Sequence, residues 1–118
     1  MNIKENAKNH FRGLRSGELS IIEVPEWSNE TEIAKIYYKP SMSLKERDRI
    51  SKEYEKNGTM SGIAMTLIVR ALDESGKALY RPMEKLDIMN ENDSDVILRI
   101  VEEMNANEID NVEDAGKN

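Results

Sequence analysis

Cysteine is absent from the 118-residue sequence, and histidine occurs once, as His10. Without cysteine the chain can form neither disulfides nor thiolate metal sites, and one histidine is too few for the usual zinc-binding arrangements. A single histidine also excludes most histidine-based catalysis. We expect His10 to be exposed. We therefore expect no metal and no cofactor.

Long hydrophobic runs are absent as well. The longest apolar runs, such as Leu-Ile-Val at 67–69, are far shorter than the roughly 20 residues that a membrane-spanning helix needs. Residues 1–15 lack the apolar centre of a secretion signal. We therefore expect no membrane partner and a protein that acts in the compartment where it is made.

Basic residues are outnumbered: the sequence has 17 of them and 23 acidic residues, which gives a formal net charge of −6. This balance argues against binding through a phosphate backbone, so we expect no nucleic acid partner. Residues 1–15 nevertheless carry four basic residues and one acidic residue, whereas residues 107–118 carry four acidic residues and one basic residue. Two interpretations stay open: head-to-tail association into a homo-oligomer, and two ends that are simply solvated.

The first half of the sequence predicts a β-hairpin preceded by a basic segment. Residues 3–15 place apolar residues at helical spacing, but so thinly that a mobile arm and a loosely docked helix both fit. Residues 18–24 are rich in β-branched residues and stop at a proline, and residues 32–39 provide the returning strand, with Trp27 at the loop. A third, short strand is expected near 77–81.

Several helices are predicted in the second half. Ser43 and Glu46 form a capping-box pattern that opens a charged helix. The segment 61–75 is apolar nearly all round, which is typical of a central core helix. Residues 83–89 predict one or two helical turns, and the helix predicted over 93–104 carries an apolar stripe of Val96, Ile97, Ile100, Val101 and Met104.

These elements predict the α+β class, with a small antiparallel sheet packed against two or three helices. Residues 1–17 are the basic N-terminal arm or loose helix, and residues 18–104 form a single α+β domain. Residues 105–118 are predicted to be an acidic, disordered tail. A chain of this length can bury one ordinary hydrophobic core, so one domain is expected.

The segment RALDESGKALYRP at 70–82 invites comparison with nucleotide-binding and acid–base sites. A phosphate loop requires G-x-x-x-x-G-K-[ST], but alanines stand where the first glycine and the hydroxyl belong. Asp73 and Glu74 are adjacent at a helix end and so point in different directions rather than facing each other across a cleft. We interpret the segment as a turn in which Gly76, with positive φ, terminates the core helix, and we expect no enzymatic activity.

Aromatic residues are scarce, which makes Trp27, Tyr37 and Tyr38 distinctive. Neighbours in a strand point to opposite faces, so one of the two tyrosines must face away from the core. Covering the sheet and contacting a partner protein both stay open as roles for these aromatics. With three apolar helix residues they make up the predicted partner-binding set: Trp27, Tyr37, Tyr38, Met65, Ile97 and Met104.

Two parts of the sequence carry a family resemblance. The first is SIIEVPEW at 20–27 followed by IYYKPSMSLKERDRI at 36–50. The second is the stretch 65–104, where a Leu-Ile-x-Arg-Ala-Leu-Asp helix end runs through Gly-Lys-x-Leu into a short strand and a terminal helix. With these two parts in this order, residues 18–104 resemble the tail assembly chaperones of long, flexible-tailed (siphovirus-type) bacteriophages and prophages.

The resemblance implies a non-catalytic assembly factor that is made in the bacterial host cytoplasm and is not part of the mature virion. Such chaperones bind the tape measure protein, keep its apolar helices soluble and help to recruit the tail tube protein. The seven methionines suit adaptable contacts with apolar helices. We expect an apolar groove, lined from the 61–72 and 94–104 helices and the sheet edge, to receive a tape measure segment.

The alternative is a generic protein-interaction adaptor or an antitoxin-like regulator. A toxin gene next to this one would favour that alternative, whereas neighbouring tail tube and tape measure genes would favour the chaperone. Nucleic-acid binding through the basic residues at 4–15 ranks below both, because the net charge is −6 and no helix-turn-helix signature is present.

Overall fold

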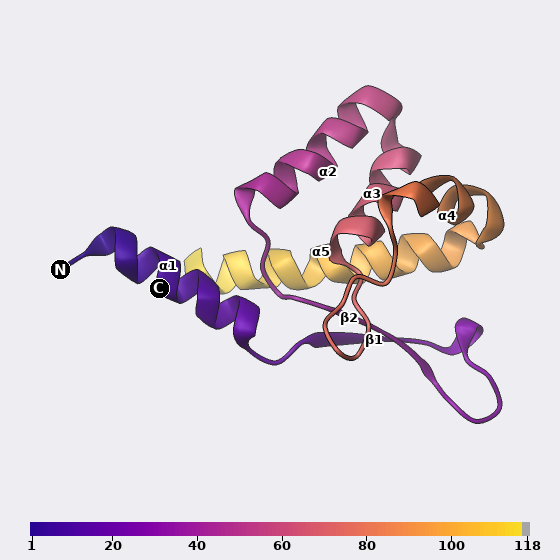
Figure 1. The fold of residues 1–118 in the computed structure, drawn as a ribbon, viewed down its shortest axis with the longest axis horizontal. Coiled ribbons are helices and arrows are strands. Elements are labelled where there is room, and N and C mark those ends of the chain that lie inside the picture. The colour runs from indigo at the N-terminus through magenta and orange to yellow at the C-terminus, as the bar shows by residue number, and fades with distance from the viewer. Residues whose placement is uncertain (117–118) are drawn as a thin grey trace.

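The computed structural model describes the backbone of residues 1–116 and the side chains of residues 1–106. Within residues 1–116 it contains five α-helices and a two-stranded antiparallel sheet, which confirms the predicted α+β class. In chain order the elements are α1 (Ile3–Ser16), β1 (Ser20–Val24), β2 (Ala34–Tyr38), α2 (Leu44–Asn57), α3 (Thr59–Arg70), α4 (Lys85–Glu91) and α5 (Ser94–Gly116) (Figure 1).

Strands β1 and β2 form the predicted hairpin, with Ile22 opposite Ile36. Alternation along each strand turns these two residues inward together with Val24 and Tyr38, and all four are buried. The prediction that only one of the adjacent tyrosines faces the core is confirmed, because Tyr37 points to the other face and is half-buried. The hairpin therefore contributes one apolar face to the core.

Leu72 extends the sheet edge by a single residue. Its amide donates to the Tyr37 carbonyl at 2.7 Å, and the Tyr37 amide donates to the Leu72 carbonyl at 3.0 Å. A second isolated bridge joins Leu72 to Ala78. Residues 77–81 thus meet the sheet through a bridge rather than a full strand, because the chain turns at Pro82 into a short 3-10 helix.

Helices α2 and α3 are joined at Gly58, whose φ of 92° is one that glycine adopts readily and other residues do not. The predicted capping box at the start of α2 is confirmed: the Glu46 amide donates to Ser43 Oγ at 3.1 Å, and the Ser43 amide donates to Glu46 Oε1 at 3.0 Å. These local bonds satisfy amides at the helix start that have no partner within the helix.

Helix α3 ends at Arg70, so the prediction that Gly76 terminates the core helix is wrong. Gly76 has the predicted positive φ, 86°, but it lies in the turn that follows. The reason is tertiary: Leu72 pairs with Tyr37, which holds the backbone after Arg70 in an extended conformation. Sheet pairing therefore overrides the helical pattern of residues 71–75.

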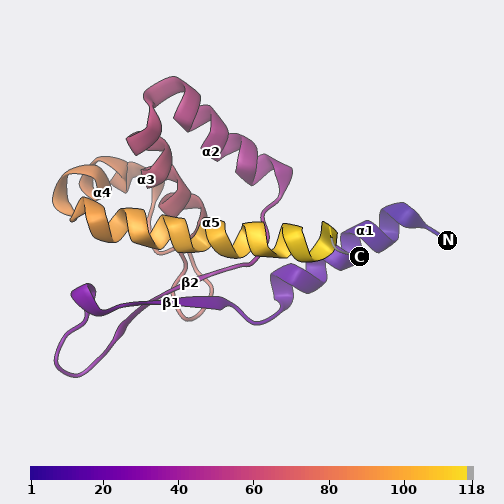
Figure 2. The same cartoon turned by 180° about the vertical axis from the view of Figure 1, so that it is seen from behind.

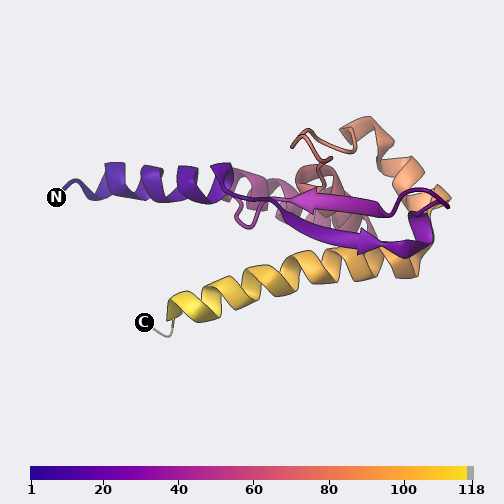
Figure 3. The same cartoon turned by 90° about the horizontal axis from the view of Figure 1, so that it is seen from below.

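The core lies between the hairpin, α3 and α5. Strand β1 contacts α5, which runs along the hairpin (Figure 3). The predicted helical turns at 83–89 are confirmed as a 3-10 helix followed by α4. The largest completely buried side chains come from all three parts of the core and are Tyr38, Leu67, Ile100, Met104 and Val24.

Helix α5 continues past residue 105, so the backbone of residues 105–116 is helical where the sequence predicts a disordered tail. Neither proline nor glycine occurs between Met104 and Gly116, so no residue in that stretch breaks the helix. Residues 117 and 118 of the predicted tail, and the side chains of residues 107–118, lie outside the described residues.

The basic N-terminal segment is the helix α1, which buries none of its residues. It begins where Asn2 accepts a hydrogen bond from the Glu5 amide at 3.1 Å. Seen from both sides, α1 lies at one end of the molecule and α4 at the other (Figures 1 and 2). Among the described residues, no helix has the length and apolar character needed to cross a membrane.

Candidate partner-binding groove

The turn at residues 73–77 is built around the Asp73 carboxylate. Its Oδ1 accepts from the Ser75 hydroxyl at 2.7 Å and from the Ser75 and Lys77 amides at 2.9 and 3.0 Å. The bonds from the Ser75 hydroxyl and the Lys77 amide lower the pKa of Asp73 below its ordinary value. The carboxylate thus holds the turn together, in line with the turn interpretation of this segment, while Glu74 and Lys77 are exposed.

Arg70 does not join this turn, because its side chain lies in the core and is 4% exposed. Its Nη2 donates to the Lys39 carbonyl at 3.0 Å, its Nη1 lies 3.4 Å from the Met104 carbonyl, and its guanidinium is 5.2 Å from the centre of the Tyr38 ring. Burial lowers the pKa of Arg70. Arg70 therefore ties the end of α3 to the end of β2 and to α5.

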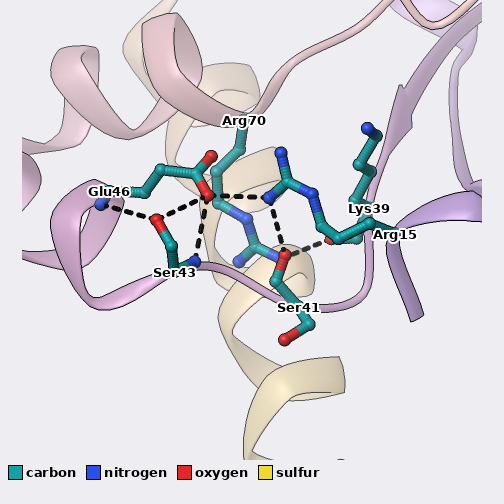
Figure 4. Close-up of polar contacts among 6 residues, drawn as sticks. All are labelled: Arg15, Lys39, Ser41, Ser43, Glu46 and Arg70. Atoms are coloured by element: carbon teal, nitrogen blue, oxygen red, sulfur yellow. Dashed lines mark hydrogen bonds and ion pairs between the residues drawn. The ribbon is translucent and has the colours of Figure 1, made fainter. Parts of the chain in front are cut away.

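Arg15 lies beside Arg70 and attaches α1 to the rest of the fold (Figure 4). Its Nη1 donates to Glu46 Oε1 at 2.7 Å and to the Ser41 carbonyl at 3.3 Å. Burial alone raises the pKa of Glu46, but hydrogen bonds from Ser43 and Arg15 outweigh it and lower the pKa overall. Arg15 and Arg70 both have partners, so the two guanidinium groups join separate elements of the fold.

The six residues predicted to bind a partner do not form one surface. Three of them are buried in the core, because alternation and helical periodicity turn them inward: Tyr38, Ile97 and Met104. The other three are half-buried and come from the 3-10 turn after β1, from β2 and from α3: Trp27, Tyr37 and Met65. Ile97 also lines a groove between α3, α4 and α5.

An apolar groove lies between the first turns of α3, the short helix α4 and the first turns of α5. It has a volume of about 180 Å³. Met60, Met89 and Leu98 are 55%, 42% and 37% exposed at its edges. Its complete lining is Met60, Ile63, Ala64, Ile88, Met89, Asn92, Ser94, Ile97 and Leu98, and this set is called the apolar groove below.

The apolar groove occurs on two of the elements from which the sequence predicts a groove, the 61–72 and 94–104 helices. Helix α4, rather than the sheet edge, completes it. Sequence reasoning missed the contribution of α4 because residues 83–89 form too short a helix to show a reliable apolar face. The signal that could have found it is the pair Ile88 and Met89 directly before a polar stretch.

The lining of the apolar groove is mostly apolar. None of its lining residues is ionisable, so it provides apolar contact area and no acid–base pair. Residues 86–98 supply six of the nine lining residues and contain four acidic residues, and Lys85 and Arg99 flank this segment directly. An apolar side of a helix would complement such a lining.

Among the residues whose side chains are described, no group of three or more His, Cys, Asp or Glu residues is placed to hold a metal ion. Comparison of the chain with family models, with curated proteins and with solved structures finds no match.

Proposed function

We propose that the protein is a tail assembly chaperone of a siphovirus-type phage or prophage. In this proposal it is non-catalytic, works in the cytoplasm of the bacterial host, binds the tape measure protein and aids assembly of the tail tube, and it does not remain in the mature virion. The sequence resemblance over residues 18–104 supports this role. The structural observation that carries it is the apolar groove, with ionisable groups absent from its lining.

The apolar groove suits transient binding of an apolar helix. Each large apolar side chain that it takes from water contributes about 1.5–3 kcal/mol, so one or two anchors give a weak complex that can dissociate when the tail assembles. Met60 and Met89 have flexible, polarisable side chains and can adjust to anchors of different shape. The net charge of −6 helps to keep a complex with an apolar client in solution.

Co-expression with the tape measure protein of the same phage or prophage tests the proposal. We expect the soluble fraction of the tape measure protein, measured after centrifugation, to rise when this protein is present. Met89→Lys should abolish most of that rise, because it places a charge in the apolar groove. Met83→Lys is the matched control, since Met83 is 81% exposed and does not line the groove.

Two outcomes would count against the proposal. If the tape measure protein is as insoluble with this protein as without it, the chaperone function is wrong. If Met83→Lys loses as much activity as Met89→Lys, the client binds somewhere other than the apolar groove. A pull-down of the tail tube protein, with and without the tape measure protein, tests the second partner in the same way.

A further inference from the structure

A small cavity lies where the end of α1, the end of β2, the start of α2 and the end of α3 meet. Its volume is about 150 Å³, and three of its lining residues are cationic whereas one is acidic. Figure 4 draws these four charged residues together with Ser41. The complete lining is Arg15, Lys39, Ser41, Met42, Glu46, Val69, Arg70, Leu72 and Gly76, and this set is called the basic cavity below.

Within its own lining, the basic cavity has one carboxylate for three cations. Arg15 forms an ion pair with Glu46 at 2.7 Å. Arg70 donates to the carbonyl oxygens of Lys39 and Met104, and a carbonyl group satisfies a donor without cancelling its charge. Among the residues whose side chains are described, none forms an ion pair with the Lys39 ammonium group. The lining therefore carries an excess of two positive charges in a protein whose net charge is −6.

The cations of the basic cavity differ in burial. Arg70 is 4% exposed, whereas the Arg15 side chain is 29% exposed. Burial lowers the pKa of Arg70, and the positive charges of Arg47 and Arg15 lower it further. Tyr38 and Glu46 act in the opposite direction. Because the effective dielectric constant is lower around a buried group, an anion in the cavity is attracted more strongly by Arg70 than by an arginine on the surface.

The size and the charge of the basic cavity fit a phosphate group. An engineered apolar cavity of about 150 Å³ holds benzene, and a phosphate ion has fewer heavy atoms than benzene. At pH 7 a phosphate group carries about −1.5 to −2 charges, which matches the excess of positive charge in the lining. Guanidinium groups present planar N–H donors that suit phosphate oxygens, and a lysine adds a compact charge.

We propose that the basic cavity binds a phosphate group, either as the free ion or at the end of a small molecule, with Arg15, Lys39 and Arg70 as its cationic ligands. These ligands come from α1, from the residue after β2 and from the last residue of α3. A bound phosphate group would therefore bridge three elements and add to the bonds that attach α1. The inference does not depend on the chaperone function, because it concerns a different part of the molecule from the apolar groove.

Calorimetric titration of the purified full-length protein with sodium phosphate at about pH 7 tests the proposal. We expect one site with a dissociation constant of about 1 mM, since solvent reaches part of the lining. Phosphate concentrations stay below about 20 mM, where its general stabilising effect on folded proteins is small. Raising sodium chloride from about 0.05 M to 1 M should weaken binding, because the Debye length falls to about 3 Å. A titration that releases no more heat than dilution would overturn the proposal.

Lys39→Gln locates the site. It removes one cation from the basic cavity, and we expect the dissociation constant to rise at least about tenfold, because hydrogen bonds to charged groups are the stronger ones. Lys35→Gln is the matched control, since Lys35 is exposed and does not line the cavity. It should bind phosphate as tightly as the parent protein. If Lys39→Gln binds as tightly as the parent, or if both variants are equally weakened, phosphate is an adventitious ion only and the basic cavity is not its site.

Nuclear magnetic resonance provides a readout that needs no variant. The amide signals of Lys39, Ser41 and Gly76 should shift with phosphate concentration and saturate at the calorimetric dissociation constant. Signals from the apolar groove should not move. Shifts confined to other parts of the chain would contradict the proposal.

The choice of anion tests the assignment to a phosphate group. Acetate carries one charge and should bind at least about tenfold more weakly than phosphate. Equal affinity for acetate would contradict the assignment. Glycerol 3-phosphate distinguishes the two sources: binding at least as tight as that of free phosphate indicates a phosphate monoester, and weaker binding indicates the free ion. No client is present in these experiments, so they and the co-expression experiment fail independently.

Discussion

Gly62 of α3 lies directly against the ring of Tyr54 of α2. A Cβ atom at Gly62 would come within 2.3 Å of Tyr54 Cγ, which is far closer than two carbon atoms can approach. The absence of a side chain at Gly62 therefore allows α2 and α3 to pack closely. Because α3 also carries Met60, Ile63 and Ala64, this contact helps to position one wall of the apolar groove.

Gly62→Ala should therefore destabilise the protein. Alanine gains about 1 kcal/mol in helix propensity, but overpacking costs about 1–3 kcal/mol, and here the clash is with the base of an aromatic ring. We expect a fall in the melting temperature of about 5 °C, measured by circular dichroism. Gly13→Ala is the matched control: no atom lies within 4 Å of its added Cβ, so the melting temperature should not fall. Equal losses in both variants would contradict the packing argument.

The Glu53 carboxylate connects α2 to α3 and α4. Its Oε1 accepts from Lys85 Nζ at 2.5 Å, from Ser61 Oγ at 2.7 Å and from Asn57 Nδ2 at 2.9 Å. These bonds lower the pKa of Glu53 from 4.5 to about 2, and the bond from Lys85 has the largest effect. A carboxylate with a lowered pKa in the folded state stabilises the fold above its unfolded pKa and loses that effect as the pH falls.

Glu53→Gln should therefore lower the melting temperature at pH 7. The difference in melting temperature between the variant and the parent protein should shrink as the pH falls from 4.5 to about 2, because Glu53 of the folded parent becomes protonated over this interval. Thermal unfolding at several pH values measures this. Glu55→Gln removes the same charge from the exposed side of α2 and serves as the control. A difference for Glu53→Gln that stays constant down to pH 2.5 would show that the carboxylate charge is not the cause.

Arg70→Lys should destabilise the protein although it keeps the positive charge. An ammonium group cannot reproduce the planar guanidinium that reaches both the Lys39 and Met104 carbonyls. A buried carbonyl left without its donor costs about 1–3 kcal/mol, which urea unfolding would register as a lower midpoint. The exposed Arg49→Lys is the control and should leave the midpoint unchanged. A stable Arg70→Lys variant would mean that charge alone suffices at this site.

Local features of the fold were predictable because neighbouring residues determine them. The capping box at Ser43 and Glu46, the hairpin and the turn around Asp73 all depend on side chains within a few positions of one another. The alternation of a strand also predicts that one of Tyr37 and Tyr38 faces inward. It does not say which one, since that depends on the side of the sheet that α3 and α5 cover.

Long-range features were not predictable, because the deciding partners are distant in sequence. Arg70 is buried because its acceptors, 31 and 34 residues away, lie at the end of β2 and on α5. Helix α3 stops at Arg70 because Leu72 pairs with Tyr37. The apolar groove was predicted in part from the stripes of two helices, whereas α4 joined it only through the tertiary arrangement.

The apolar groove predicts that client binding depends on the groove and not on α1. Met89→Lys should lose the ability to keep the tape measure protein soluble, because it places a charge in the groove. Phe11→Asp should keep that ability, because Phe11 belongs to α1 and does not line the groove. The measurement is the soluble fraction of the tape measure protein at graded expression of each variant. A Phe11→Asp variant that is impaired in the same measure as Met89→Lys would show that α1 contributes to client binding.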